Sequence, residues 1–160
     1  MTAEEIKALL KLEAHPEGGW YRRTYTSEVS VALLRGVRPY GTSIYYLLEE
    51  GTFSEMHMVA SDEIFHFYLG DPVEMLLLYP DARSAVLTLG PDLETGQQPQ
   101  ILVPAGVWQG EWLVEGGKMA LFGCTVTPGF DFADYHSGSY AELAATWPAE
   151  AERIRKLTRR

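Results

Sequence analysis

The sequence predicts an all-β protein, a jelly-roll barrel with a short N-terminal helix and C-terminal helices. From Gly19 to Val126 the chain consists of short runs rich in Tyr, Val, Ile, Leu, Phe and Trp, which are residues typical of strands. Gly, Pro and Asp separate these runs at short, regular intervals, as turns do. Eight or more antiparallel strands in a chain of 160 residues normally close into a barrel or sandwich, because open edges invite aggregation.

The elements follow from local signals. Thr2 and Glu5 form a capping box ahead of IKALLKL, whose apolar residues have helical spacing. Ser139 caps a later helix that Pro148 interrupts, and a further helical segment runs through the basic tail. One domain, 1–160, is expected, with the barrel at about 19–127. The strands are expected near residues 20–27, 42–49, 53–60, 63–69, 73–79, 84–89, 100–104, 107–113 and 118–127.

Composition argues against several classes of protein. With 13 basic and 22 acidic residues the net charge is −9, which disfavours nucleic acid as a partner. No apolar run approaches the length of a membrane span, and the N-terminus lacks the order of a secretory signal, so a cytoplasmic protein without membrane contact is expected. The single cysteine, Cys124, lies in the apolar run KMALFGCTV and is interpreted as a buried, inert thiol.

The stretch GTFSEMHMVASDEIFHFYLGDP carries the chemistry, because His57 and Glu63 flank the turn Ala60-Ser61-Asp62. A turn between paired antiparallel strands would bring both side chains into one cavity, where His57 can be a base or nitrogen ligand and Glu63 an acid or oxygen ligand. Gln109 begins a strand just after the Pro104-Ala105-Gly106 turn, and its amide can ligate weakly or hydrogen-bond a substrate.

Strand alternation selects the other candidates for ligand binding. Glu63, Phe65 and Phe67 share one face, and such apolar neighbours would raise the pKa of the carboxyl. One of Tyr45 and Tyr46 should face the cavity, and Tyr45 is the candidate. His66 points to the opposite face in a regular strand, as a core or interface residue, and enters the pocket only if a bulge resets the alternation.

Other polar residues have simpler explanations. His15, beside Pro16, is interpreted as a turn residue, and Trp20 and Tyr21 as cover for the barrel mouth or a dimer edge. Asp131, Asp134 and His136 cluster before Ser139, and a turn with Asp caps explains them without a metal.

These stretches resemble the two motifs of the cupins. The first, G(x)5HxH(x)3-4E(x)6G, is matched by Gly51, His57, Glu63 and Gly70, with Val59 in place of the second His. The second ends in PxG, two residues and a His, and here Pro104 and Gly106 are kept while Gln109 replaces the His.

More narrowly, the chain resembles the DUF985 or cupin-5 group over about residues 15–136. The similarity rests on HPEGGWYRRTY, SIYYLL, SDEIFHFYLGDP, LGPDLETGQQPQILVPAGVWQ and GCTVTPGFDFADY, in this order. Arg23 stands where an acidic residue is expected. The resemblance implies an RmlC-like cupin double-stranded β-helix and a homodimer, and it implies no established activity.

The candidate site leaves three functions open. A metal-binding cupin uses three histidines and a glutamate, whereas His57, Glu63 and Gln109 offer at best a weakly bound divalent metal. The first hypothesis is therefore a metal-independent isomerase or epimerase for a sugar-like substrate, with His57 as base, Glu63 as its orienting partner or acid, and Arg22, Arg23, Arg35 and Arg38 as the nearby cations. The alternative is a non-catalytic module that holds a small ligand. A metal-dependent cupin enzyme is the minority alternative.

Overall fold

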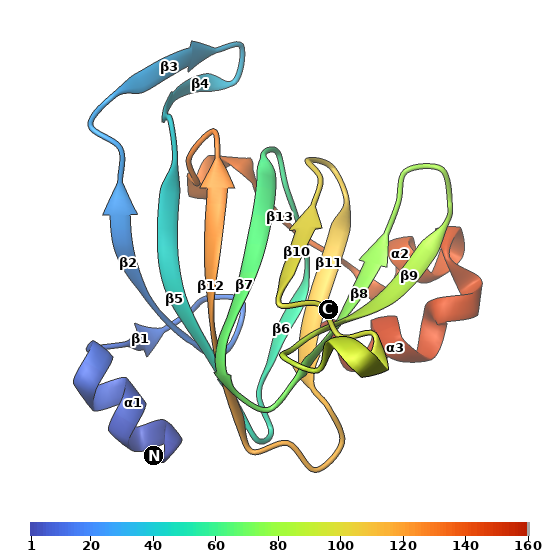
Figure 1. Ribbon diagram of the computed structural model, residues 1–160. Helices are drawn as coiled ribbons and strands as arrows, with labels where there is room; N and C mark the ends of the chain where they lie inside the picture. The colour runs from blue at the N-terminus through green and yellow to red at the C-terminus, as the bar shows by residue number, and fades with distance from the viewer. Residues whose placement is uncertain (160) are drawn as a thin grey trace.

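The computed structural model describes residues 1–159, which form two antiparallel sheets packed face to face (Figure 1). The first sheet has the strand order β1-β2-β5-β12-β7-β10 and the second β13-β6-β11-β8-β9, while β3 and β4 form a separate hairpin. The helices and strands are α1 (Ala3–Leu10), β1 (Glu13–Ala14), β2 (Trp20–Thr26), β3 (Ser30–Leu33), β4 (Gly36–Pro39), β5 (Thr42–Glu49), β6 (Phe53–Val59), β7 (Asp62–Gly70), β8 (Val73–Leu78), β9 (Ser84–Leu89), η1 (Leu93–Thr95), β10 (Gln100–Val103), β11 (Trp108–Leu113), β12 (Met119–Thr127), η2 (Phe132–Asp134), β13 (Tyr135–Ser137), α2 (Tyr140–Thr146), η3 (Pro148–Glu150) and α3 (Ala151–Lys156).

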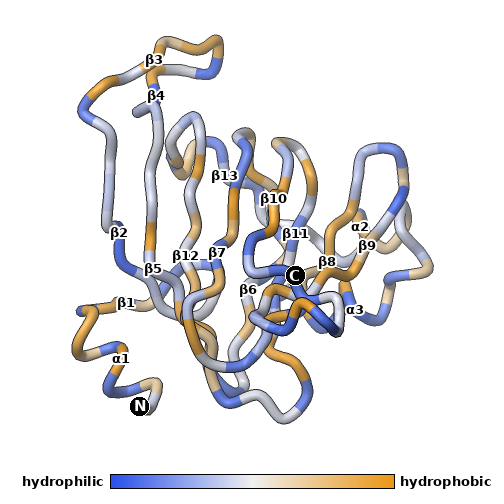
Figure 2. Tube along the Cα trace, in the orientation of Figure 1, coloured by the Kyte–Doolittle hydropathy of each residue, from blue (hydrophilic) through white to orange (hydrophobic). Residues whose placement is uncertain are grey.

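Three apolar clusters stabilise this arrangement. The main core fills the space between the sheets, and apolar stretches along β8 and β12 contribute to it (Figure 2). Helix α1 buries Ile6 against Leu47 and Leu121 on the outer face of the first sheet. Helices α2 and α3 bury Leu143 and Ile154 against the outer face of the second. Both sheets are thus covered on their outer faces over part of their area, in addition to the core that they share.

The predicted fold class and its nine strands are confirmed, with boundaries shifted by at most one residue. The N-terminal capping box also forms, since the Thr2 side chain accepts a hydrogen bond from the Glu5 amide and Glu5 accepts one from the Thr2 amide. The prediction omitted β1, β13 and the β3-β4 hairpin. These elements are short, and β3 and β4 lie in a stretch, 27–41, in which Arg, Gly and Pro interrupt the apolar alternation.

One predicted pairing is wrong. Strands β6 and β7, on either side of the Ala60-Ser61-Asp62 turn, do not pair with each other, because β6 pairs with β11 and β13 while β7 pairs with β12 and β10. The turn instead carries the chain from one sheet to the other. Both strands still present one face to the space between the sheets.

The β3-β4 hairpin projects beyond the end of the first sheet (Figure 1) and is attached through Asp134. Arg38 donates to both carboxylate oxygens of Asp134, each at 2.8 Å, and Arg35 donates Nε to Oδ2 at 3.2 Å. Arg35 also donates to Ser61 Oγ at 2.7 Å. The hydrogen bonds from Arg38 hold the pKa of Asp134 below its usual range. The interpretation of both aspartates as caps is therefore right for Asp131, which accepts from the Ala133 amide, and incomplete for Asp134.

Among residues 1–159, no helix combines the length and the apolar character that crossing a membrane demands.

The attachment of the hairpin yields a prediction. Asp134→Asn keeps the shape of the side chain and removes the charge that both guanidinium groups share, so the amides of β3 and β4 should exchange with D2O faster than in the wild type. Hydrogen exchange followed by mass spectrometry measures this directly. Asp131→Asn, a matched change three residues away, should leave the exchange of the hairpin unaltered, and equal exchange in the two variants would contradict the assignment.

Candidate functional site

A cavity of about 90 Å³ lies between the two sheets. It is walled by β2, β5, β6, β7 and β12, together with segment 15–17 and the loop before η2. The lining residues are His15, Glu17, Tyr21, Arg23, Thr42, Ile44, His57, Val59, Glu63, Cys124, Val126, Phe130 and Phe132. The predicted pair of His57 and Glu63 therefore does meet in one cavity, although the two strands that carry it belong to different sheets.

Gln109 completes the predicted triad. It lies opposite His57 in the β11-β6 ladder, and its Nε2 donates to Glu63 Oε2 at 2.8 Å. All three side chains are buried, with exposed fractions of 3% for His57, 8% for Glu63 and 1% for Gln109. The side-chain amide of Gln109, on the second sheet, thus holds one carboxyl oxygen of Glu63, which lies on the first sheet.

The geometry sets the tautomer of His57. Its Nδ1 lies 2.6 Å from the Glu55 carbonyl oxygen, which can only accept, so Nδ1 carries the hydrogen and Nε2 holds the lone pair. Tyr135 stacks on the ring with centroids 5.2 Å apart, and burial lowers the pKa of His57. The imidazole is therefore a neutral, oriented base whose Nε2 is unprotonated.

Glu17 and His15 belong to this site, and sequence reasoning missed both. Glu17 Oε2 is 3.5 Å from His57 Nε2, and the Glu17 amide donates to His15 Nδ1 at 3.1 Å. His15 packs edge-on against Tyr21 with centroids 4.4 Å apart, and burial lowers its pKa to about 3. His15 does begin a turn, as predicted, since its carbonyl accepts from the Gly18 amide at 3.0 Å, but it also lines the cavity, which the prediction did not include.

The sequence signal that points to His15 and Glu17 is the pair Gly18-Gly19, which follows them directly. Gly18 has φ +113°, and a Cβ there would lie 2.0 Å from the Phe53 carbonyl oxygen. Only glycine lets segment 15–19 run this close to β6, where the Glu55 amide donates to the Glu17 carbonyl at 2.9 Å. Tyr46 adds a hydroxyl that donates to the Gly18 carbonyl.

Three carboxyl groups are buried in this interior, those of Glu17, Glu63 and Glu111. Burial raises the pKa of Glu63 to about 7 and that of Glu17 to about 8, and it raises the pKa of Glu111 well above its usual range. Among residues 1–159 none of them forms an ion pair with Lys or Arg. Uncompensated charge is costly here, so these groups hold protons near neutral pH.

Some buried polar atoms have no hydrogen-bond partner within residues 1–159. They are Ser54 Oγ, Gln109 Oε1 and Glu111 Oε1. Such atoms cost free energy unless a water molecule or ligand satisfies them, and they mark this interior as a polar site rather than plain core.

The structure corrects several predicted pocket positions. Tyr46, rather than Tyr45, faces the interior, while Tyr45 lies on the outer face with Leu47. Phe65 and Phe67 face inward as predicted but pack in the main core and do not line the cavity. His66 lies on the outer face, where it hydrogen-bonds Thr125 and Gln100, each at 3.1 Å, because the ladder irregularity falls beyond it in β7. Cys124 is buried, as predicted, and lines the cavity.

Of the four predicted cations, only Arg23 lines the cavity. Arg35 and Arg38 are engaged with Asp134, and Arg22 lies over the Tyr45 ring at 5.5 Å. Arg23 is exposed and donates to Thr26 Oγ1 at 3.3 Å. It is therefore the guanidinium available to an anionic group at the mouth of the cavity.

The residues present do not fit the metal that a cupin site would hold. Within residues 1–159, no group of three or more His, Cys, Asp or Glu is arranged to bind a metal ion. Val59 supplies no ligand atom, and Gln109 directs its amide N–H at Glu63 Oε2. A donor set with one imidazole and a carboxyl that tends to be protonated binds divalent ions weakly.

Comparison with known proteins places this geometry in a family. Residues 4–137 match the model of the family described as Cupin superfamily (DUF985). The uncharacterized protein YML079W of Saccharomyces cerevisiae is 30% identical over 140 residues, which cover 78% of this chain and 69% of the yeast protein.

Solved structures agree with this placement. Protein SO0799 of Shewanella oneidensis superposes with a TM-score of 0.91 at 35% identity, covering 99% of this chain and 98% of its own. A hypothetical protein from Leishmania major gives 0.91 at 29% identity, covering 99% of each chain. Oxalate decarboxylase of Bacillus subtilis, at 18% identity and a TM-score of 0.56 over 91% of this chain and 37% of its own, shares the fold alone. The jelly roll, the PxG turn and the matched residues together show that the chain belongs to the cupin superfamily, in the Cupin_5 (DUF985) family.

Proposed function

We propose that this protein is a metal-independent isomerase that moves a proton on a small, polar, sugar-like compound carrying a hydroxyl beside a carbonyl group. One observation carries the proposal. A neutral, oriented imidazole and a carboxyl with a pKa of about 7 face the same cavity. A base and an acid whose pKa values lie near the working pH are what proton transfer at carbon requires.

The roles follow from the contacts. His57 Nε2 takes the proton from the carbon next to the carbonyl, and the C–H electron pair moves into an enediol. Glu63, held by Gln109, gives its proton to the carbonyl oxygen. Return of the proton from His57 to the neighbouring carbon, with proton transfer from the adjacent hydroxyl to Glu63, completes the isomerisation and restores both groups. Glu17 Oε2, 3.5 Å from His57 Nε2, can accept a hydrogen bond from the imidazolium that forms between the two steps.

The cavity limits the substrate. Its volume of about 90 Å³ is well below the roughly 300–1,000 Å³ typical of pockets that enclose a whole small molecule, so it admits the reacting end of a small compound. Arg23 at the mouth favours a substrate whose other end is anionic. A one-base site also favours transfer between neighbouring carbons over epimerisation, since inversion needs a proton donor on the opposite face of the substrate.

A non-catalytic binding module is the second candidate. The aromatic wall of Tyr21, Phe130 and Phe132 supports it, because apolar rings around a few polar groups are typical of ligand pockets. In such a module the affinity survives the loss of His57 and depends on the wall, whereas in the isomerase turnover depends on His57.

Proton transfer can be tested without knowing the natural substrate. Glyceraldehyde, dihydroxyacetone and erythrulose are incubated with the protein in D2O, and NMR records deuterium entering the carbon next to the carbonyl. The isomerase should accelerate this exchange for at least one of them, and His57→Gln should slow it by about 10²–10⁴-fold.

His66→Gln is the matched control, since this histidine lies on the outer face of β7. This variant should catalyse deuterium incorporation into the substrate at the rate of the wild type. Exchange that survives His57→Gln rejects the proposal. Thermal stabilisation by these compounds without exchange supports the binding module.

The protonated carboxyls predict how stability depends on pH. Glu17 has a folded-state pKa of about 8 against an ordinary 4.5, so the folded protein keeps a proton that the unfolded chain releases between these values. The free energy of unfolding should therefore fall as the pH rises from about 5 to 8, by up to about 1.4 kcal/mol per pH unit for each such group.

Urea unfolding at several pH values measures this slope. Glu17→Gln should flatten it and should raise the free energy of unfolding above pH 8 relative to the wild type. Glu13→Gln, at an exposed position on β1, should leave the slope as it is. A slope unchanged by Glu17→Gln would show that this carboxyl is not protonated in the folded state.

A homodimer is also proposed. It is supported by the apolar and aromatic residues exposed along the first sheet, of which Tyr25, Tyr68 and Leu69 have exposed fractions of 57%, 49% and 37%. Light scattering coupled to size-exclusion chromatography should give twice the chain mass of 17.9 kDa. A mass of one chain would reject the dimer.

A further inference from the structure

A second hollow lies on the outer face of the second sheet, the one that contains β6, β11 and β8. It shares no lining residue with the cavity around His57 and Glu63. It has a volume of about 390 Å³, within the range of small-molecule pockets. Its walls come from the start of β6, from β8, from the end of β11 and from α3. The lining residues are Gly51, Thr52, Phe53, Glu74, Trp112, Arg153, Lys156 and Leu157, and we call this hollow the α3 groove.

The floor of the α3 groove is aromatic. Phe53 and Trp112 are direct partners in the β6-β11 ladder, so their side chains lie next to each other on the same face of the sheet. Both pack beside the cluster that buries Leu157 and Ile154, yet each stays partly exposed. A pair of adjacent rings left open to solvent offers a flat surface on which another ring can stack.

The wall on the α3 side is cationic. Arg153 and Lys156 are three positions apart and therefore lie on one face of the helix. Lys156 has no ion-pair partner among residues 1–159, and Arg153 pairs with Glu150 at 2.8 Å while half of its side chain stays exposed. The Arg159 guanidinium lies 5.1 Å from the centre of the Phe53 ring.

This concentration of positive charge stands out against the net charge of −9. Glu74, opposite Trp112 in the β8-β11 ladder, is the one acidic residue among those lining the groove. The lining itself holds two cations, Arg153 and Lys156, against this one carboxyl. Since Arg153 also pairs with Glu150, Lys156 is the lining cation that has no ion-pair partner among residues 1–159, and it favours an anion. Glu74 can in addition accept a hydrogen bond from a hydroxyl or amino group of the same ligand.

We propose that the α3 groove binds a small planar aromatic anion. Its ring stacks on Phe53 and Trp112, and its carboxylate, sulfonate or phosphate group lies between Arg153 and Lys156. This site is separate from the isomerase site and does not depend on the proposed function.

The test uses two fluorescent probes that differ in charge. 8-Anilinonaphthalene-1-sulfonate has the required ring and anion, and N-phenyl-1-naphthylamine has the same ring system without the sulfonate. The anionic probe should bind the wild type at least about tenfold more tightly than the neutral one. Equal affinity for the two probes would overturn the proposal.

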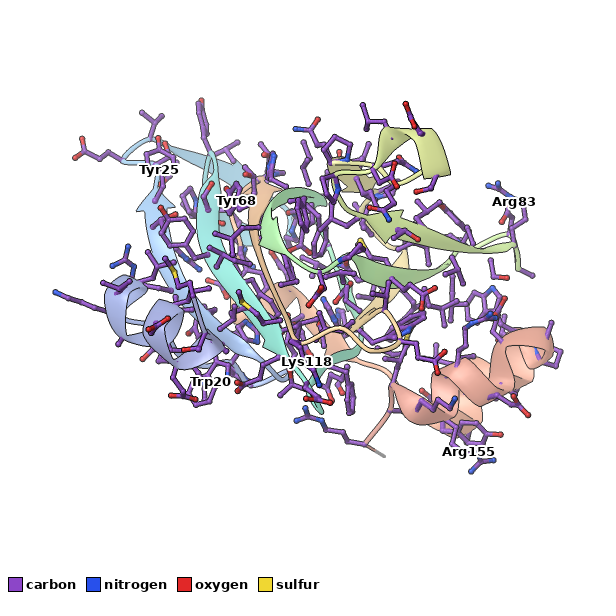
Figure 3. The ribbon with its side chains drawn as sticks, turned by 60° about the horizontal axis from the view of Figure 1, so that its bottom comes forward. Trp20, Tyr25, Tyr68, Arg83, Lys118 and Arg155 are labelled. Atoms are coloured by element: carbon purple, nitrogen blue, oxygen red, sulfur yellow. The ribbon has the colours of Figure 1, made fainter. Side chains whose placement is uncertain are left out.

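Matched variants on one helix locate the binding. Lys156→Glu should weaken binding of the anionic probe by about tenfold or more. Arg155→Glu changes the net charge by the same amount, but Arg155 lies over Tyr140 at 4.0 Å on the outer side of the C-terminal helices (Figure 3), so binding should change by less than about twofold.

Trp112→Phe keeps an aromatic floor and tests the position of the ring. It should retain binding of the anionic probe and reduce energy transfer from tryptophan to the probe. Circular dichroism and thermal unfolding confirm that each variant folds. If Lys156→Glu and Arg155→Glu weaken binding equally, or if neither does, the α3 groove is not the site.

Discussion

Two crossings of the chain between the sheets lie side by side, and a pair of hydrogen bonds joins them. The turn after β6 leads to the first sheet, and the turn after β10 leads back to the second. Asp62 accepts from the Ala105 amide at 2.8 Å, and the Gly106 amide donates to the Val59 carbonyl at 3.1 Å. Since His57 and Glu63 flank the first crossing and Gln109 follows the second, this link holds the three side chains in register. The geometry of the candidate site therefore depends on these two hydrogen bonds between the crossing turns.

The interior that results is rich in buried carboxyl groups. A cupin with a full set of histidines can balance its buried carboxylate with a metal, whereas within residues 1–159 Glu17, Glu63 and Glu111 form no ion pair with Lys or Arg. Protons take that place, because a neutral carboxyl is far cheaper to bury than a charged one. With Val59 and Gln109 in the places where the cupin motifs have histidines, burial therefore favours the protonated form of these carboxyls.

The sequence predicted what depends on periodicity and on well-known turn chemistry. Strands β5 to β12, the capped helices, and the meeting of His57, Glu63 and Gln109 follow from alternation and from Gly and Pro. It could not predict which strands pair across Ala60-Ser61-Asp62, because a crossing turn and a hairpin turn use the same residues. Glu17 and His15 were missed since their loop reaches the site only after folding, and Tyr45 was chosen over Tyr46 because alternation fixes the period of a strand but not which set faces inward.

The ion pairs of Asp134 have a mechanical meaning beyond attachment of the hairpin. Asp134 lies between Phe132, which lines the cavity, and Tyr135, which stacks on His57. On its other side the same carboxylate holds Arg35 and Arg38 of the projecting hairpin. The hairpin is therefore connected through Asp134, and also through the hydrogen bond from Arg35 to Ser61, to the cavity wall beside His57. A displacement of the projecting hairpin would thus reach the residues that line the cavity through side-chain hydrogen bonds.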